Sequence, residues 1–187
     1  MKLGFPPDSR RVRVWRGSGQ QERLRYVQGV RPYSGIQVIM WAGIIFHKRT
    51  VPVFVEGTLN QYQYIDRTLE PVVLPFATAA GPALRYMQDN AKPHTAATVR
   101  DWFRNENITL LPWPAQSPDL NPIEHVWDVL QRRITPHLHN VHTNQGLQDI
   151  LTREWNLLPQ NEIDNLIFNM PRRCKAVINA AGGNSGY

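Results

Sequence analysis

The sequence predicts a layered α/β or α+β domain, in which strands come first and helices then alternate with strands. Two short apolar runs, at residues 36–46 and 50–57, have the length of buried strands. After residue 58, apolar residues recur at intervals of three and four, which is the pattern of helices that bury one face. The chain has 187 residues, of which 42% are hydrophobic, so it can bury a core of its own.

The predicted strands begin near the N-terminus. The sequence "RRVRVWR" at 10–16 alternates basic and apolar residues, which indicates a half-buried strand with arginines on its open face. Residues 35–46 predict either two central strands or one bent strand, with a break near Gly43. Pro52 places the strand at 50–57 at a sheet edge, because proline cannot donate to a strand ladder.

The first predicted helix follows these strands. Thr58 is expected to cap it, Gln61 to complete a capping box, and Pro71 to end it. The sequence "ALRYMQDN" at 83–90 then predicts a short strand, and a helix that begins at Thr95 follows this strand.

A long helix is predicted to begin at Pro122, after a buried strand at 108–114. Its apolar side chains recur on one stripe, which is typical of a helix that packs on a core. The residues of this stripe are Ile123, Val126, Trp127, Leu130 and Ile134.

Two more helices are predicted near the C-terminus, at 143–158 and 161–183, and Pro171 is expected to kink the second one. We expect the chain to divide into a core at 1–135 and a helical extension at 136–187 that packs on this core. The order of the predicted elements, strands first and then alternating strands and helices, favours a single domain with a small helical extension.

The composition excludes several classes of protein. Cys174, which we expect to face inward on the last helix, is the only cysteine, so neither an internal disulfide nor a cysteine-built zinc site can form. The longest apolar run has eleven residues, which is too short to span a bilayer. Met1 is followed by "KLGFPPDSRR", which has no apolar signal segment. We therefore expect an intracellular protein that is not secreted and has no membrane partner.

The net charge of +6 is concentrated in residues 1 to 31. This segment holds Asp8 and Glu22 against eight basic residues, so residues 32 to 187 are neutral overall. Such a basic patch favours a polyanionic partner, nucleic acid above all, although a solvated strand face explains it equally well. The basic residues are Lys2, Arg10, Arg11, Arg13, Arg16, Arg23, Arg25 and Arg31.

Glu124 has two interpretations. It lies three residues after Asn121, which is a favoured N-cap, and Pro122 suits the first helical position. This spacing predicts a capping box, and the helix dipole also favours a carboxylate in the first turn. Alone, the pattern favours a structural role over a catalytic one.

A second carboxylate, Asp89, lies where the predicted strand at 83–90 ends. Catalytic groups in α/β sheets gather at strand ends, although turn aspartates are common there too. Thirty-four residues separate Asp89 from Glu124, and a path through a helix and a strand returns to the same side of a sheet. Two carboxylates brought together can share divalent ions, and oxygen ligands suit Mg²⁺ or Mn²⁺. Such ions would activate a water or a 3′-hydroxyl and stabilise the leaving oxygen.

Together these segments resemble the catalytic domain of the mariner-type DDE transposases. The resemblance covers nearly the whole chain, and its motifs are "DSRRVRVWR", "MWAGI", "DNAKPHTA", "LLPWPAQSPDLNPIEHVWDVL" and "MPRRCKAVINAAGG". It implies a ribonuclease-H-like fold, with a mixed sheet flanked by helices, and DNA strand cleavage and transfer that use Mg²⁺ or Mn²⁺. It also implies that Asp89 and Glu124 are metal ligands, as the second and third members of an acidic triad.

The same resemblance implies partners and a location. Members of the family act on DNA, generally as dimers, so we expect DNA and a second copy as partners, a nuclear location and no small-molecule cofactor. For His94, holding its loop is an alternative to contacting substrate phosphate. The residues expected to contact DNA are Arg10, Arg11, Arg13, Arg16, Lys92 and His94.

One triad member is expected to lie before residue 1. In the family, the first aspartate lies in a strand just before the segment that here begins "MKLGFPPDSRR", and Asp8 matches a hairpin turn instead. We therefore expect a truncated first strand, weak metal binding and little or no DNA cleavage. The edge of "RRVRVW" is expected to be unprotected, and the family's helix-turn-helix region to be absent.

Three functions remain open on the sequence. The chain is an inactive transposase-derived domain that still binds DNA, or an active nuclease whose missing strand comes from a longer product or another chain. Alternatively, it is a domesticated module that binds nucleic acid or protein without using the acidic pair. His137, His139 and His142 favour a polar loop over a metal cluster, and Trp113 favours packing over base stacking.

Overall fold

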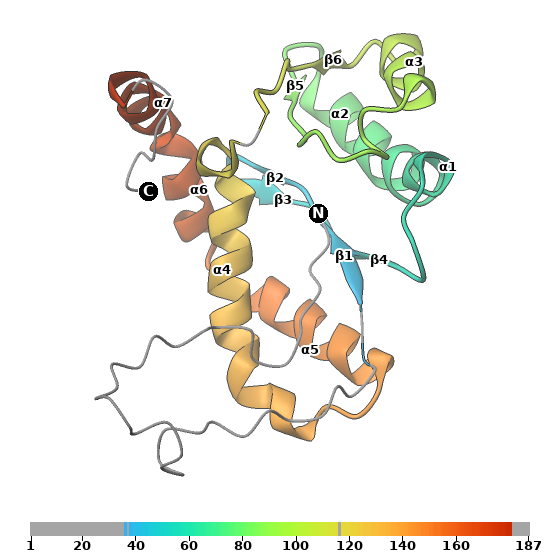
Figure 1. The fold of residues 1–187 in the computed structure, drawn as a ribbon, viewed down its shortest axis with the longest axis vertical. Helices are drawn as coiled ribbons and strands as arrows, with labels where there is room; N and C mark the ends of the chain where they lie inside the picture. Colours follow the sequence, from blue (N-terminus) through green and yellow to red (C-terminus); the bar gives the residue numbers. More distant parts are fainter. Residues whose placement is uncertain (1–35, 37, 116, 181–187) are drawn as a thin grey trace, which may run out of the picture.

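The computed structural model describes residue 36, residues 38–115 and residues 117–180. The predicted strand at 10–16 lies outside these residues, as does the whole basic segment 1–31. In the described part, short strands come first, and helices then alternate with two further strands (Figure 1). This order agrees with the prediction.

The long apolar run forms two strands with a break at Gly43, as predicted. β1 pairs with β4 and β2 pairs with β3, both antiparallel. The N–H of Gly43 donates to Oγ1 of Thr50 at 2.8 Å, and a Cβ at Gly43 would lie 3.2 Å from Cγ2 of Thr50. This close approach explains glycine at the break. The strands are β1 (Ile39–Trp41), β2 (Ile44–Ile45), β3 (Lys48–Arg49) and β4 (Val53–Val55).

A helical run follows β4 and changes its hydrogen-bond pattern twice, through α1 (Gln61–Tyr64), the π-helix η2 (Ile65–Val73) and α2 (Leu74–Ala80). The predicted cap at Thr58 is wrong: Asn60 caps the run and forms the capping box with Gln63. The predicted end at Pro71 is also wrong. Proline disrupts α-helical bonding, and here the chain takes the wider π-helical pattern instead of ending.

A parallel strand–helix–strand unit comes next. β5 (Arg85–Tyr86) and β6 (Thr109–Leu110) pair in parallel, and α3 (Ala97–Asn105) connects them, as parallel strands require. Both strands lie within their predicted ranges. The helix begins two residues after the predicted start at Thr95, with no side-chain cap.

The rest of the described chain is helical. The helix predicted at 161–183 is two helices, because Pro171 lacks an N–H and lies in the first turn of the second one. The inward position predicted for Cys174 is wrong, since this residue is exposed. None of the described helices is long and apolar enough to cross a bilayer. The elements are η3 (Pro118–Leu120), α4 (Pro122–Ile134), η4 (Thr135–Asn140), α5 (Asn144–Leu157), α6 (Gln160–Phe168) and α7 (Met170–Asn179).

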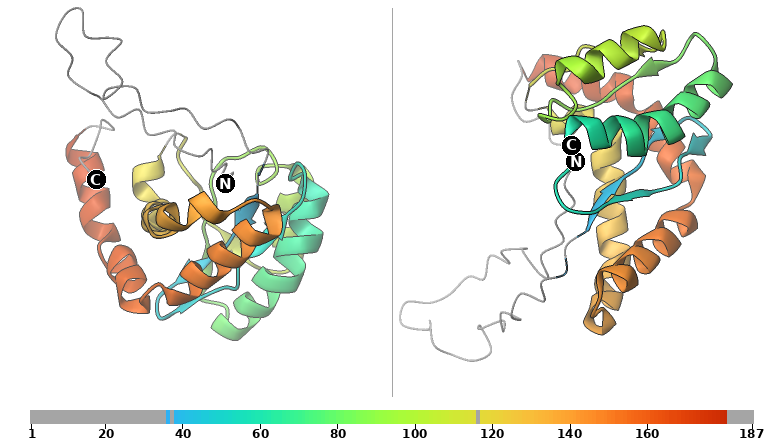
Figure 2. Two further views of the ribbon diagram at one scale, coloured as in Figure 1. Left: turned by 90° about the horizontal axis from the view of Figure 1, so that it is seen from below. Right: turned by 90° about the vertical axis from the view of Figure 1, so that its right-hand side faces the viewer.

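Strands β1 to β4 lie between two groups of helices, whereas β5 and β6 lie beside α2 and α3 (Figures 1 and 2). Val38, Met40 and Ala42 pack in one core with α4, α5 and α6. Trp41 instead packs in a second core with η2 and α3. This alternation is expected for a strand that is covered on both faces, and it produces a three-layer α/β arrangement.

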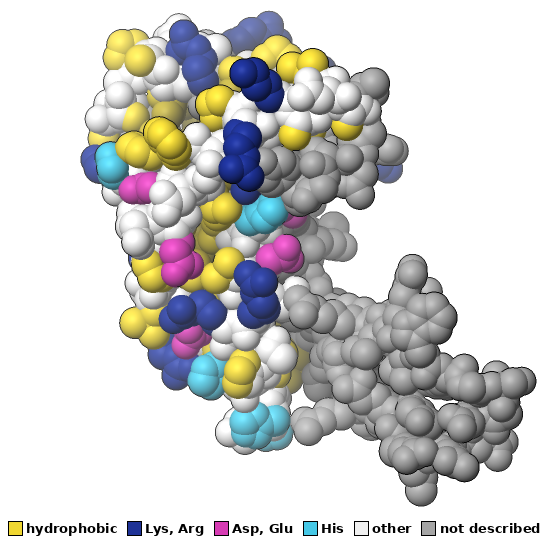
Figure 3. Space-filling model, turned by 90° about the vertical axis from the view of Figure 1, so that its left-hand side faces the viewer, with side chains coloured by type: hydrophobic (Ala, Val, Ile, Leu, Met, Phe, Trp, Pro, Cys, Tyr) yellow, Lys and Arg dark blue, Asp and Glu magenta, His cyan; other side chains and the backbone are white. Residues whose placement is uncertain are grey.

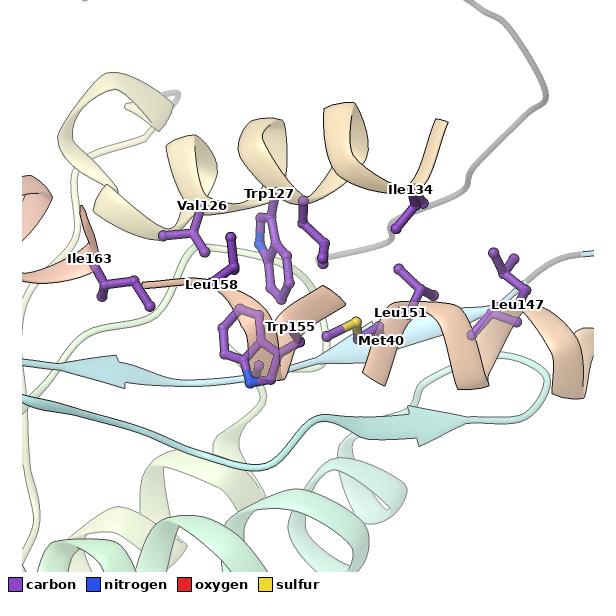
Figure 4. Packing of buried hydrophobic residues seen from close by; sticks show 12 residues of the cluster. Met40, Val126, Trp127, Ile134, Leu147, Leu151, Trp155, Leu158 and Ile163 are labelled. Atoms are coloured by element: carbon purple, nitrogen blue, oxygen red, sulfur yellow. The ribbon is translucent and has the colours of Figure 1, made fainter. Parts of the chain in front are cut away.

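The first core contains two stacked tryptophans, Trp127 on α4 and Trp155 on α5 (Figure 4). Their ring centroids are 5.5 Å apart, and both side chains are buried. The indole N–H of Trp155 donates to the carbonyl of Thr50 at 2.9 Å, which ties α5 to the loop between β3 and β4. This core therefore includes residues from both sides of the boundary at 135/136, and the boundary itself stays a prediction.

Candidate functional site

Asp89 and Glu124 line the same cavity, which has a volume of about 200 Å³. Asp89 lies beyond the end of β5, and Glu124 lies in the first turn of α4. The chain between them passes through α3, β6 and η3, which includes the predicted helix and strand. The structure thus brings the two predicted carboxylates to one place.

The Asp89 carboxylate is held through one of its two oxygens. Nδ1 of His94 forms a hydrogen bond with Oδ1 at 2.5 Å, and the N–H of Ala91 donates to the same oxygen at 3.2 Å. Within the described part of the chain, Oδ2 has no hydrogen bond. The hydrogen bond from His94 lowers the pKa of Asp89 to about 2, against the opposing effect of burial. Asp89 is therefore ionised at neutral pH.

Glu124 lines the cavity, but the capping box predicted for it with Asn121 is wrong. Asn121 precedes α4, but its side chain makes no capping hydrogen bond to the backbone. Its Nδ2 instead donates to Oε1 of Glu124 at 3.3 Å, so the amide faces the carboxylate. Burial raises the pKa of Glu124, and the negative charge of Asp89 also acts in that direction. The two carboxylates thus interact electrostatically.

His94 and Lys92 share the loop after Asp89 but differ in exposure. His94 is 4% exposed, whereas Lys92 is an exposed residue. Because Nδ1 of His94 binds Asp89 and little of the ring reaches solvent, the geometry favours the loop-holding role over contact with phosphate. The role of Lys92 in DNA contact stays a prediction.

Two residues of the site were not predicted from the sequence, Tyr64 and Gln88. The hydroxyl of Tyr64 donates to Oε1 of Gln88 at 2.9 Å, and Nε2 of Gln88 donates to the carbonyl of His94 at 3.0 Å. Gln88 directly precedes Asp89 at the predicted strand end, and this position could have identified it as a site residue. The sequence around Tyr64 does not indicate a place in the site, because only the folded chain brings α1 beside this loop.

Two other candidates from the sequence, His137 and Trp113, do not line the cavity, and the role of the Trp113 indole stays a prediction. His137 lies in η4, and its Nε2 is 3.8 Å from a carboxylate oxygen of Glu154. Residues 36, 38–115 and 117–180 contain no group of three or more His, Cys, Asp or Glu that could hold a metal. The carbonyl of Trp113 accepts from Nδ2 of Asn90 at 3.0 Å, which joins the loop after β5 to the loop after β6.

The cavity lies between two sheet edges. Its lining includes six successive residues at 40–45 and six at 84–89. A strand face presents alternate residues, so successive residues indicate that the edges of β1, β2 and β5 face the cavity. Among the described strands, β1 pairs with β4 alone and β5 with β6 alone, so each keeps an edge without a strand partner. The predicted unprotected edge at 10–16 lies outside the described residues.

Comparison with known proteins identifies similar sequences. A family model described as DDE superfamily endonuclease matches residues 2–148. The chain is 42% identical over 134 residues to the transposable element Tcb1 transposase of Caenorhabditis briggsae, covering 70% of this chain and 47% of that protein. It is 39% identical over 178 residues to the transposable element Tc1 transposase of Caenorhabditis elegans, covering 93% of this chain and 63% of that protein.

Comparison with solved structures identifies the fold. The Mos1 transposase catalytic domain, in its structure with raltegravir and Mg, superposes with a TM-score of 0.59 at 20% sequence identity. The match covers 79% of this chain and 83% of that chain. The predicted α/β, ribonuclease-H-like fold is confirmed. In the described residues its strands form three two-stranded sheets, two antiparallel and one parallel, and not the single mixed sheet that was predicted. The chain spans about half the length of the Tcb1 relative.

Proposed function

Because the chain belongs to the DDE superfamily endonucleases, we propose that it is a transposase catalytic domain in which Asp89 and Glu124 are metal ligands for DNA strand cleavage and transfer. Residues 1–187 by themselves bind the metal weakly and cleave DNA little or not at all. One observation carries the proposal. Two carboxylates from distant parts of the chain line one cavity, and Oδ2 of Asp89 makes no hydrogen bond within the described residues.

The donor set suits Mg²⁺ or Mn²⁺. Both cations prefer oxygen ligands, and Nδ1 of the nearby His94 is engaged by Asp89. Asp89 is ionised before a cation arrives, and a nearby cation would favour the ionised form of Glu124 as well. Two bound divalent ions would activate the attacking oxygen and stabilise the leaving oxygen. The similar Mos1 catalytic domain was solved with Mg.

Two carboxylates are too few for full activity on this proposal. They carry two negative charges, which offset only half the charge of two divalent ions. An active enzyme needs a further acidic ligand. A strand between the unpaired edges of β1 and β5 would pair with both and would pass beside Asp89. An acidic side chain on such a strand would complete the metal site.

DNA is the proposed substrate, a second copy of the chain is a proposed partner, and the nucleus is the proposed location. The segment 1–31 carries the net charge of +6, which favours a polyanion. Figure 3 shows a face on which Lys and Arg side chains lie on both sides of a band with acidic and histidine side chains. The similar proteins Tcb1 and Tc1 are transposases by name.

Metal titration tests the assignment of the two ligands. The free-ion electron paramagnetic resonance signal of Mn²⁺ is followed as the 187-residue chain is added. We expect weak binding that is lost in Asp89→Asn and in Glu124→Gln, and is kept in Asp101→Asn, a matched exposed carboxylate on α3. Equal binding by all four proteins contradicts the assignment, and retained DNA binding would then favour the module that does not use the acidic pair.

Replacing Glu124 with glutamine is expected to stabilise the fold at pH 7. Burial raises the pKa of Glu124, so ionisation costs stability in the folded state, and the contribution of this group is lost as the pH rises through its folded pKa. Glutamine removes the charge and keeps an oxygen that can accept from Asn121. We expect urea unfolding to show a gain of up to about 1 kcal/mol at pH 7, because solvent screens a half-buried carboxylate, and this gain disappears at low pH. A loss of stability at pH 7 would contradict this sign and would mean that the ionised carboxylate stabilises the fold.

A further inference from the structure

The imidazole of His94 is held in one orientation by residues from three segments. Its ring lies 4.4 Å from the ring of Tyr64, centroid to centroid, and is 4% exposed. The carbonyl of His94 accepts from Nε2 of Gln88 at 3.0 Å, and Gln88 accepts from the hydroxyl of Tyr64 at 2.9 Å. These contacts connect α1, the end of β5 and the loop: Gln88 holds the backbone of His94, and the ring packs on Tyr64 with Nδ1 toward Asp89.

The two nitrogens of this ring have different surroundings. Nδ1 lies 2.5 Å from Oδ1 of Asp89, whereas Nε2 is buried and has no hydrogen-bond partner among the described residues. An ionised carboxylate only accepts hydrogen bonds, so Nδ1 carries the proton. A buried nitrogen without a partner costs stability. The position of the ring therefore satisfies the contact of Nδ1 with Asp89, whereas Nε2 is left without a hydrogen bond among the described residues.

We propose that His94 is a positioning residue that orients the Asp89 carboxylate for a divalent cation; this inference rests on the proposed function. Both donors to Asp89 among the described residues, the His94 ring and the N–H of Ala91, bind Oδ1. Oδ2 is thereby left to the cation. A donor that holds one oxygen of a ligating carboxylate fixes the plane of the carboxylate and the direction of the other oxygen's lone pairs.

Two amide substitutions separate this role from packing. The side-chain N–H of asparagine lies near the position of Nδ1, whereas that of glutamine lies near the position of Nε2. His94→Asn therefore keeps a donor to Asp89, and His94→Gln moves the donor away. We expect Mn²⁺ affinity to fall about tenfold or more in His94→Gln and to stay within about threefold of the wild type in His94→Asn.

The measurement is the Mn²⁺ titration of the wild type, Asp89→Asn and the two His94 variants, with thermal unfolding of each to show that it is folded. Equal Mn²⁺ binding by the wild type and Asp89→Asn overturns the proposed function itself. Binding that depends on Asp89 but is unchanged in His94→Gln overturns the positioning role alone. Equal losses in both His94 variants also overturn it, because the position of the donor would then not matter.

A second measurement uses the wild type alone. Nitrogen-15 correlation spectra of the labelled chain distinguish a ring proton on Nδ1 of His94 from one on Nε2. We expect the proton on Nδ1. A neutral ring with its proton on Nε2 cannot donate to Asp89, and this result overturns the proposal even where neither His94 variant folds.

Discussion

Replacing Trp155 with alanine is expected to lower the free energy of unfolding by about 3–5 kcal/mol, the largest effect of any single change considered. Trp155 is fully buried, stacks on Trp127 with a centroid distance of 5.5 Å, and lies under the guanidinium of Arg49 at 5.8 Å. Alanine would leave a cavity between α4, α5 and β1. It would also leave the carbonyl of Thr50 without the 2.9 Å hydrogen bond from the indole.

Urea unfolding at neutral pH, followed by far-ultraviolet circular dichroism, measures this effect. Trp155→Phe keeps most of the packing but loses the hydrogen bond, so we expect an intermediate loss of about 1–2 kcal/mol. Leu157→Ala is the matched control on the same helix, because Leu157 is 57% exposed, and its effect should stay within about 0.5 kcal/mol. If Trp155→Ala lowered the free energy of unfolding as little as the control does, the packing around Trp155 would not be a main source of stability.

Replacing Glu154 with glutamine is expected to cost about 1.5–3 kcal/mol at pH 7. Glu154 is 6% exposed, and its oxygens accept from Nε of Arg133 at 3.0 Å and from Nε of Arg153 at 3.1 Å. Burial acts to raise the pKa of Glu154, but the hydrogen bonds from the two arginines outweigh it and the pKa is lowered. The arginines are partly exposed and can return to water, which keeps the effect below that of a fully buried pair.

The stabilising contribution of Glu154 decreases as the pH falls. Because the folded state lowers the pKa of Glu154, its stabilising contribution is present above the ordinary glutamate pKa and is lost as the pH falls through the folded value. The difference between the wild type and Glu154→Gln should therefore shrink on acidification in a urea series. Asp149→Asn, an exposed carboxylate on the same helix, is the control and should show little change. A constant difference down to low pH would contradict the charge-based explanation.

Helix stripes were the most predictable part of the fold. Val126, Trp127, Leu130 and Ile134 are all buried, as the spacing along α4 indicated, because a helix that packs on a core must bury one stripe. Helix ends were less predictable. Thr58 and Asn60 are both good caps, and only the packed chain selects Asn60. Cys174 is exposed because α7 is a separate helix, and a periodicity extended across Pro171 could not show this.

The carboxylate pair was predictable because it follows from topology. A strand end and a helix start, joined by a helix and a strand, return to the same region, and Asp89 and Glu124 do line one cavity. His94, which contacts Asp89, was a candidate from the sequence, but the other contacts around the pair were less predictable. The capping box at Asn121 is absent because its amide turns to Glu124, and the contacts of Tyr64 and Gln88 with the His94 segment depend on tertiary packing.

We propose that Asp89 and Glu124 bind the metal and that these two carboxylates are too few for residues 1–187 to cut DNA. The most direct measurement is nicking of supercoiled plasmid by the purified chain with Mg²⁺ or Mn²⁺, with Glu124→Gln alongside. We expect no metal-dependent nicking by either protein, together with salt-sensitive DNA binding by both. Nicking that needs the metal and disappears in Glu124→Gln would contradict it, because this chain alone would then complete the site.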